Sequence, residues 1–81
     1  MKKSDLERKF SQLLERSREA MLRALRDGEK PSALMFYGNI CGLADAMRAV
    51  ELVDWEQAAY IRDQAWALYR RGGDDADDEA S

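Results

Sequence analysis

Residues 38–53, GNICGLADAMRAVELV, decide the fold, because they place small residues at helical spacing beside an apolar stripe. Gly38, Gly42 and Ala46 are four residues apart, so they share one face of a helix. A face without side-chain bulk lets another helix approach the backbone closely. Asp45 in the same stretch excludes a helix that crosses a lipid bilayer. The stretch therefore predicts close helix packing inside a bundle or a dimer.

The helix that contains this stretch is predicted over residues 31–51. Pro31 suits its first turn, where the missing N–H would have no partner in any case. Apolar residues surround much of the helix near its start, so we expect it to be covered on most sides. The residues expected to form its packing or dimer surface are Gly38, Gly42, Ala46, Tyr37, Ile40 and Met47.

Start and stop signals predict two further helices, over residues 5–27 and 55–71. Ser4 with Glu7 reads as a capping box at the first start, and Gly28 as its left-handed stop. Asp54 with Gln57 repeats the capping box before the last helix, and Gly72-Gly73 is expected to end it.

Short connections join these helices. Only residues 52–54 separate the second from the third, so these two should form an αα-hairpin. The sequence thus predicts an all-α fold, with one helical domain over residues 1–72 followed by a tail.

Composition bounds the class of protein. The chain has 81 residues, of which 46% are hydrophobic and 36% charged, which fits a small folded helical domain. A domain of this size buries little surface, so a homodimer is expected. No apolar run is long enough to span a membrane, and the start lacks the apolar core of a signal peptide. One cysteine and no histidine fit a reducing compartment, so we expect a cytoplasmic protein.

Charge is distributed unevenly along the chain. Residues 1–30 hold nine basic and six acidic residues, whereas residues 73–81 hold five acidic residues and no basic one. The acidic end has nothing to bury and is expected to be a disordered tail. Such a tail aids solubility, or it binds a basic groove on a partner or on the first helix.

Aromatic residues and arginine mark a flank of the third helix. Trp55, Trp66 and Tyr69 recur at helical spacing with Arg62 between them, and these residue types dominate binding energies at interfaces. The same rings could instead close the core of the bundle. The residues expected to bind a partner are Trp55, Arg62, Trp66, Tyr69, Arg16 and Arg23.

No residue pattern indicates catalysis, so the protein is predicted not to be an enzyme. Cys41 has no histidine to activate it and reads as a small buried hydrophobe. No metal or cofactor is expected. The basic first helix allows contact with the phosphates of a nucleic acid, although interleaved acidic residues weaken its field.

The hairpin segment, Tyr37 to Met47 through Leu52 to Glu56, resembles segments of small accessory proteins of phages and integrative elements. These include quorum-sensing antiactivators and CRISPR inhibitors. The resemblance covers about half the chain and assigns no functional residue. It implies a stoichiometric inhibitor or regulator of a host protein, without naming the target.

Together these observations predict a non-enzymatic helical regulator or inhibitor that binds another protein and forms a homodimer. Two alternatives remain. One is a factor that contacts nucleic-acid phosphates through the first helix, and the other is a structural subunit of a larger assembly.

Overall fold

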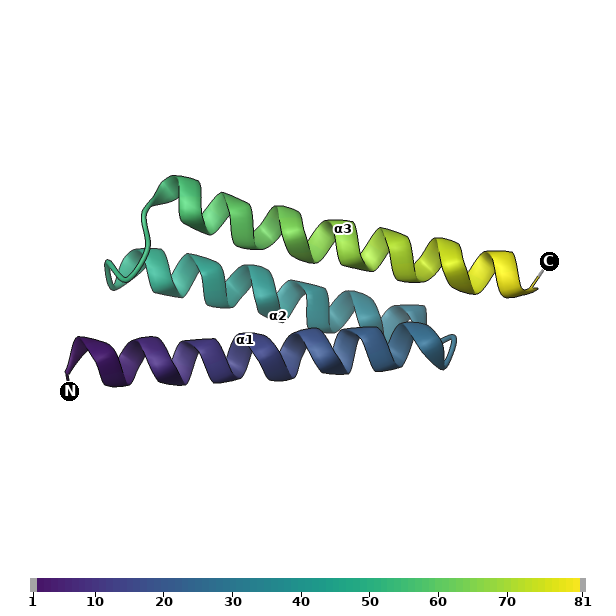
Figure 1. Cartoon of the computed structure of the whole chain (residues 1–81), viewed down its shortest axis with the longest axis horizontal. Coiled ribbons are helices and arrows are strands. Elements are labelled where there is room, and N and C mark those ends of the chain that lie inside the picture. Colours follow the sequence, from purple (N-terminus) through teal and green to yellow (C-terminus); the bar gives the residue numbers. More distant parts are fainter. Residues whose placement is uncertain (1, 81) are drawn as a thin grey trace.

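The computed structural model describes the backbone of residues 2–80 and the side chains of residues 2–72. Within that part of the chain, three helices run antiparallel to their chain neighbours: α1 (Lys3–Arg26), α2 (Lys30–Ala49) and α3 (Trp55–Ala80). α2 lies between α1 and α3 (Figure 1), and it contacts each of them more extensively than they contact one another. The predicted all-α fold and the hairpin of α2 and α3 are confirmed.

The predicted capping box at the start of α1 is wrong. The helix begins at Lys3, and its N-cap residue Lys2 makes no side-chain capping bond. Instead, the backbone N–H groups of Asp5 and Leu6 donate to the Lys2 carbonyl at 3.1 and 3.2 Å. Ser4 therefore lies inside the first turn, where its hydroxyl is not placed to cap the free N–H groups.

Both inter-helix turns use a left-handed residue just after the helix. Gly28 has φ +76°, as predicted, and Glu29 N–H donates to the Ala24 carbonyl at 2.8 Å. At the end of α2, Glu51 takes φ +61° and Leu52 N–H donates to the Met47 carbonyl at 2.9 Å. α2 therefore ends at Ala49, before the expected residue 51. No residue signals this turn in advance, because glycine usually occupies the left-handed position and here it is a glutamate.

The predicted cap of α3 is confirmed. Asp54 N–H donates to Gln57 Oε1 at 2.9 Å, and Gln57 N–H donates to Asp54 Oδ1 at 2.8 Å. Two otherwise unpaired backbone donors are thus satisfied reciprocally, which fixes the direction in which α3 leaves the loop.

Small side chains dominate the core between the helices. The largest fully buried side chains are Met21, Leu25 and Ile40. Alanine supplies five of the buried core positions, namely Ala24, Ala33, Ala44, Ala58 and Ala65. Alanine at a contact allows helices to pack at short distances, but it buries little apolar area per residue.

Gly72, expected to stop α3, instead lies at a close approach to α1. A Cβ on Gly72 would lie 2.6 Å from Leu25 Cδ1, and the α3 backbone continues through it to Ala80. Glycine adopts helical angles as well as left-handed ones, so the Gly72-Gly73 pair does not oblige the helix to end. The expected disorder of residues 73–81 concerns a segment outside the residues that the structure describes in full.

Replacing the α3 cap should destabilise the fold. We expect Asp54→Ala to lower the free energy of unfolding by about 1 kcal/mol, because Gln57 N–H loses its acceptor. Ser4→Ala is the matched control and should change stability little, since Ser4 makes no capping bond. Urea unfolding followed by circular dichroism measures both variants. Equal losses for the two would contradict the caps described above.

Candidate protein-binding surface

The Gly38, Gly42 and Ala46 ridge faces away from the core. Both glycines are exposed, Ala46 is half-buried, and no atom of another element lies within 4 Å of a Cβ placed on either glycine. The predicted packing of this ridge inside the bundle is therefore wrong. A role for the ridge between two copies remains a prediction.

Other residues predicted for the same packing surface lie elsewhere. Ile40 and Met47 are buried in the core and hold α2 against its neighbours. They do pack helices together, but they are not available to a second copy. Tyr37 is half-buried at the seam between α2 and α3.

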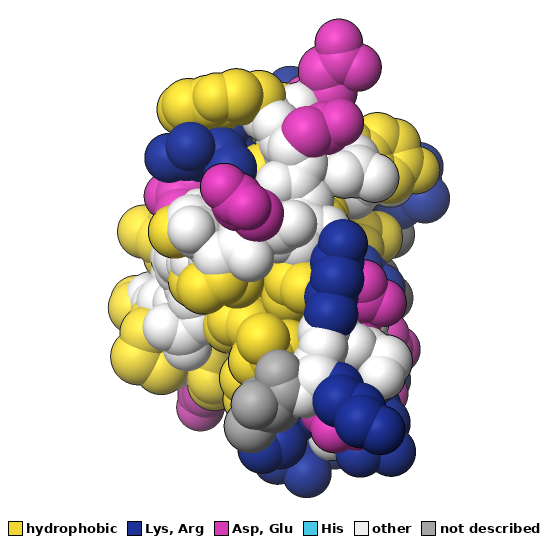
Figure 2. All heavy atoms as spheres, turned by 90° about the vertical axis from the view of Figure 1, so that its left-hand side faces the viewer, with side chains coloured by type: hydrophobic (Ala, Val, Ile, Leu, Met, Phe, Trp, Pro, Cys, Tyr) yellow, Lys and Arg dark blue, Asp and Glu magenta, His cyan; other side chains and the backbone are white. Residues whose placement is uncertain are grey.

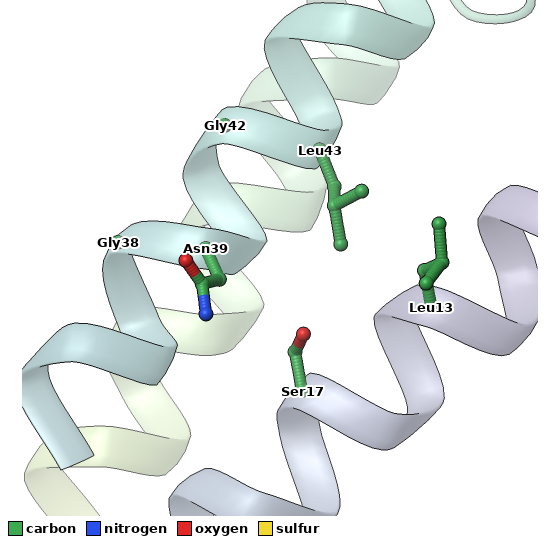
Figure 3. A pocket seen from close by; sticks show the side chains of 6 residues that line it. All are labelled: Leu13, Ser17, Gly38, Asn39, Gly42 and Leu43. Atoms are coloured by element: carbon green, nitrogen blue, oxygen red, sulfur yellow. The ribbon is translucent and has the colours of Figure 1, made fainter. Parts of the chain in front are cut away.

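A shallow groove of about 390 Å³ runs beside the glycines, between α1 and α2. Leu13 and Leu43 point into it from the two helices, and Ser17 and Asn39 lie further along (Figure 3). Leu13 remains 44% exposed. The groove thus joins apolar side chains to two uncharged polar groups, a lining suited to another chain rather than to an ion.

Three rings form a cluster on the other side of α2. Tyr37 contacts Trp66 and Tyr69 with centroid distances of 5.5 and 6.0 Å, and Trp66 stacks on Tyr69 at 5.6 Å. These spacings are those of attractive aromatic pairs, so the rings hold one another in place. Trp66 is nevertheless 44% exposed. We call Tyr37, Trp66 and Tyr69 the aromatic cluster.

Tyr37 also touches the single cysteine. A side-chain hydrogen bond with Cys41 raises the pKa of Tyr37, and burial of the ring raises it further. The hydroxyl therefore stays neutral at physiological pH, and the aromatic cluster carries no charge of its own.

The charged groups of α2 all have partners within the chain. Between Pro31 and Val50 the only charged residues are Asp45 and Arg48. Arg62 donates to Asp45 Oδ1 at 3.2 Å, and the Arg48 guanidinium lies 3.7 Å from the centroid of the Trp55 ring. Asp45 is therefore paired with a base, whereas Arg48 lies against a ring and its buried Nε has no hydrogen-bond partner among the residues described.

We call the side of α2 that faces away from the core, together with the exposed residues of α1 and α3 beside it, the α2 surface. Figure 2 looks at the end of the bundle where α2 passes into α3, and shows hydrophobic side chains along one edge and in a band between charged ones. Leu34 and Met35 are 52% and 57% exposed. The residues of the α2 surface are Leu13, Leu34, Met35, Gly38, Gly42, Ala46 and Trp66.

The structure divides the residues predicted to bind a partner. Trp66 and Tyr69 come together, whereas Trp55 lies eleven residues away from Trp66, about 16 Å along α3. Arg62 is tied to Asp45. Arg16 and Arg23 are exposed on α1, and no printed contact joins either of them to the aromatic rings, so their part in the same surface stays a prediction.

Sequence reasoning missed Leu13 as part of this surface, and it did not place Tyr37 in the aromatic cluster. Leu13 reads as one more member of the apolar stripe of α1, and Tyr37 as part of the core face of α2. One signal was present: residues 31–44 contain no charged residue, which is unusual for an exposed helix.

The side chains that the structure describes include no group of three or more histidine, cysteine or acidic residues that could hold a metal ion. None of the helices, over the residues searched, is both apolar enough and long enough to cross a bilayer. What the site offers chemically is noncovalent contact through apolar area and ring faces.

Substituting the exposed glycines should stabilise the monomer. We expect Gly42→Ala to raise the free energy of unfolding by roughly 0.5–1 kcal/mol, because alanine favours the helix and has room there. Gly72→Ala should lower it by about 1 kcal/mol, since overpacking against buried Leu25 exceeds the helical gain. Urea unfolding of dilute protein distinguishes the two. A loss of stability with Gly42→Ala in the monomer would contradict an open α2 surface.

Comparison of the chain with protein families, with curated proteins and with solved structures finds no match, so the resemblance to phage accessory proteins stays a prediction.

Proposed function

We propose that this protein is a small regulator that acts without catalysis, by binding another protein in a stoichiometric complex. The observation that carries the proposal is the aromatic cluster, in which an indole that is 44% exposed stacks on a neighbouring ring at the flank of α3. Tryptophan and tyrosine are the residues most enriched at positions that dominate binding energy.

The cluster is already ordered before any partner arrives. Trp66 stacks on Tyr69 with an interplanar angle of 15°, and Tyr37 buttresses both rings from α2. Rings held in one arrangement lose little conformational entropy on binding, so more of the contact energy appears as affinity. A soluble domain of 81 residues that kept such rings exposed for no purpose would risk aggregation.

The class of partner follows from the resemblance of residues 37–56 to phage and mobile-element accessory proteins. Those proteins occupy a surface of a host protein, and we propose the same kind of action here, in the cytoplasm. A partner for the aromatic cluster would offer an apolar pocket large enough for an indole, with polar groups around its rim.

A nucleic-acid partner is the second candidate. Arg16 and Arg23 are exposed seven residues apart on α1, and neither side chain pairs with an acidic residue among those described. Two such arginines, about 10 Å apart along the helix, could contact phosphates. A phosphate contact loses affinity steeply with salt, whereas a contact through aromatic rings changes much less.

Removing the exposed indole should abolish partner capture. We expect immobilised protein to retain a defined partner from the source cell, and Trp66→Ala to lose it by more than about tenfold, the effect of removing a dominant interface residue. Tyr60→Ala is the matched control, because Tyr60 is a 64% exposed ring on α3 outside the aromatic cluster. Quantitative mass spectrometry of the retained proteins measures both.

Three other outcomes would contradict the proposal. Retention that survives Trp66→Ala but falls with Arg16→Ala and with added salt would indicate nucleic acid as the partner. Equal losses with Trp66→Ala and Tyr60→Ala would indicate a general effect of exposed rings. A partner that never dissociates from the purified native chain would indicate a structural subunit.

A further inference from the structure

We propose that the groove between α1 and α2 receives an acidic amphipathic helix of a partner protein, held in place by a row of basic residues along α1. The row consists of Lys2, Lys9, Arg16 and Arg23, and we call it the basic row. The inference rests on the proposed function for the class of partner, a protein. It concerns a different surface, because Trp66 does not line the groove.

The basic row is a regular feature of α1. Its four residues recur every seven positions, so they follow one another at about 10 Å along the helix and drift only about 20° around it at each step. All four are exposed. Figure 2 shows Lys and Arg side chains gathered along the lower edge of the molecule, the side on which α1 lies in Figure 1. The row is thus a continuous basic edge about 30 Å long.

The positive charge of the row is not neutralised by ion pairs. In α1, the ion pairs join Arg8 to Asp5 and Arg18 to Glu15, each at 3.5 Å, and neither arginine belongs to the row. Among the residues that the structure describes, no side chain of the row forms an ion pair. The row can therefore pair with acidic groups of a ligand without first breaking a contact within the chain.

The nearest acidic side chain lies on the far side of the row from the groove. Glu19 follows Arg16 by three residues, whereas Leu13 precedes Arg16 by three, so the two lie on opposite sides of the row. The α2 side of the groove adds no charge, because residues 31–44 contain no charged residue. The charge that borders the groove is therefore positive.

The groove and the row meet at Leu13. Residues three and four apart are neighbours on a helix surface, and Leu13 follows Lys9 by four residues and precedes Arg16 by three. Leu13 and Leu43 point into the groove from the two helices (Figure 3), and Leu13 is 44% exposed. A ligand in the groove would thus contact apolar side chains and, along the α1 border, cations.

These two features favour a helix over a nucleic acid as the occupant. A helix that lies along α1 has the same rise per residue, so acidic residues seven apart on it repeat at the same distance as the basic row. Its apolar side chains beside those acids would fill the groove, as amphipathic helices do in other grooves. Charged residues that flank an apolar seam in this way form ion pairs between helices. A phosphate backbone could pair with the row, but it offers no apolar group to Leu13 and Leu43.

Residues 73–81 of a second copy are acidic, but they do not fit this description. Their hydrophobic residues are two alanines, Ala76 and Ala80, which bury too little apolar area to fill the groove. The occupant is therefore a segment of another protein.

The test uses a synthetic helical peptide of three heptads, with leucines along one side and glutamate at every seventh position beside them. We expect the labelled peptide to bind the full chain in a fluorescence anisotropy titration. Replacing Lys9 and Arg16 together by glutamate should raise the dissociation constant by more than about tenfold, because like charges then face each other. Replacing Arg70 and Arg71 together by glutamate is the matched control, since both are exposed on α3 and the change in net charge is the same.

A second peptide, with lysine in place of each glutamate, gives the reciprocal test. It should bind the natural chain at least about tenfold more weakly than the glutamate peptide, and it should bind the variant with glutamate at positions 9 and 16 more tightly than it binds the natural chain. A reversed preference of this kind cannot arise from a variant that fails to fold, and circular dichroism checks the fold independently.

Leu13→Gln tests the groove itself. We expect it to raise the dissociation constant of the glutamate peptide by about tenfold, because the buried apolar contact is lost. Leu34→Gln is the matched control, since Leu34 is a 52% exposed leucine of α2 that does not line the groove. Trp66→Ala should leave peptide binding unchanged, so this inference and the proposed function can fail separately.

Each contrary result overturns the inference. A chain that binds neither peptide at high micromolar concentration has no such site, while Trp66-dependent capture of a partner would still support the proposed function. Equal losses with the two charge reversals would indicate a general effect of net charge. Duplex DNA that displaces the peptide, with a steep dependence on salt, would assign the basic row to phosphates. A dimer that forms in sedimentation and excludes the peptide would assign the groove to a second copy.

Discussion

Contact between helices lined with alanine is the constraint on which the structure depends. Five of the buried core residues are alanine, and only Met21, Leu25 and Ile40 are large side chains removed fully from solvent. Alanine at these contacts leaves little room between the helices, so bulky apolar residues cannot all enter the core. Leu13, Leu34, Met35 and both tryptophans remain exposed for this reason. The exposed apolar surface is thus a consequence of how the core is built.

Local signals predicted the first turn and the cap of α3. The Asp54 and Gln57 bonds and the left-handed Gly28 follow from chemistry within a few residues, which a sequence displays directly. The predicted cap at Ser4 was wrong, because α1 begins with backbone hydrogen bonds to the Lys2 carbonyl and needs no side-chain cap. Glu51 could not be foreseen, since a left-handed glutamate is set by the packing of the hairpin and not by its own preference.

Glycine spacing predicted a helix face without side chains, but it did not predict whether another helix packs against that face. Gly38 and Gly42 at four-residue spacing read as a packing ridge, yet the structure leaves them open, whereas isolated Gly72 lies against Leu25. A periodic pattern identifies a face, and only the arrangement of the other helices decides whether it is covered. Trp66 and Tyr69 could be paired from their spacing on one helix. Tyr37 joins them across two helices, and that contact depends on the register of the hairpin.

The burial of α1 is confined to one end, and this has a consequence for its motion. Met21, Ala24 and Leu25 lie in the last six residues of α1, whereas Leu6 and Phe10 near its start are only half-buried. Near the start of α1, the amide hydrogens are protected mainly by the hydrogen bonds of the helix itself, so they exchange with solvent through local fraying. Those near Leu25 exchange only on global unfolding. Leu13, on the border of the α2 surface, lies between these two parts of the helix. The α1 side of the groove is therefore more mobile than the α2 side, because α2 packs between two neighbouring helices.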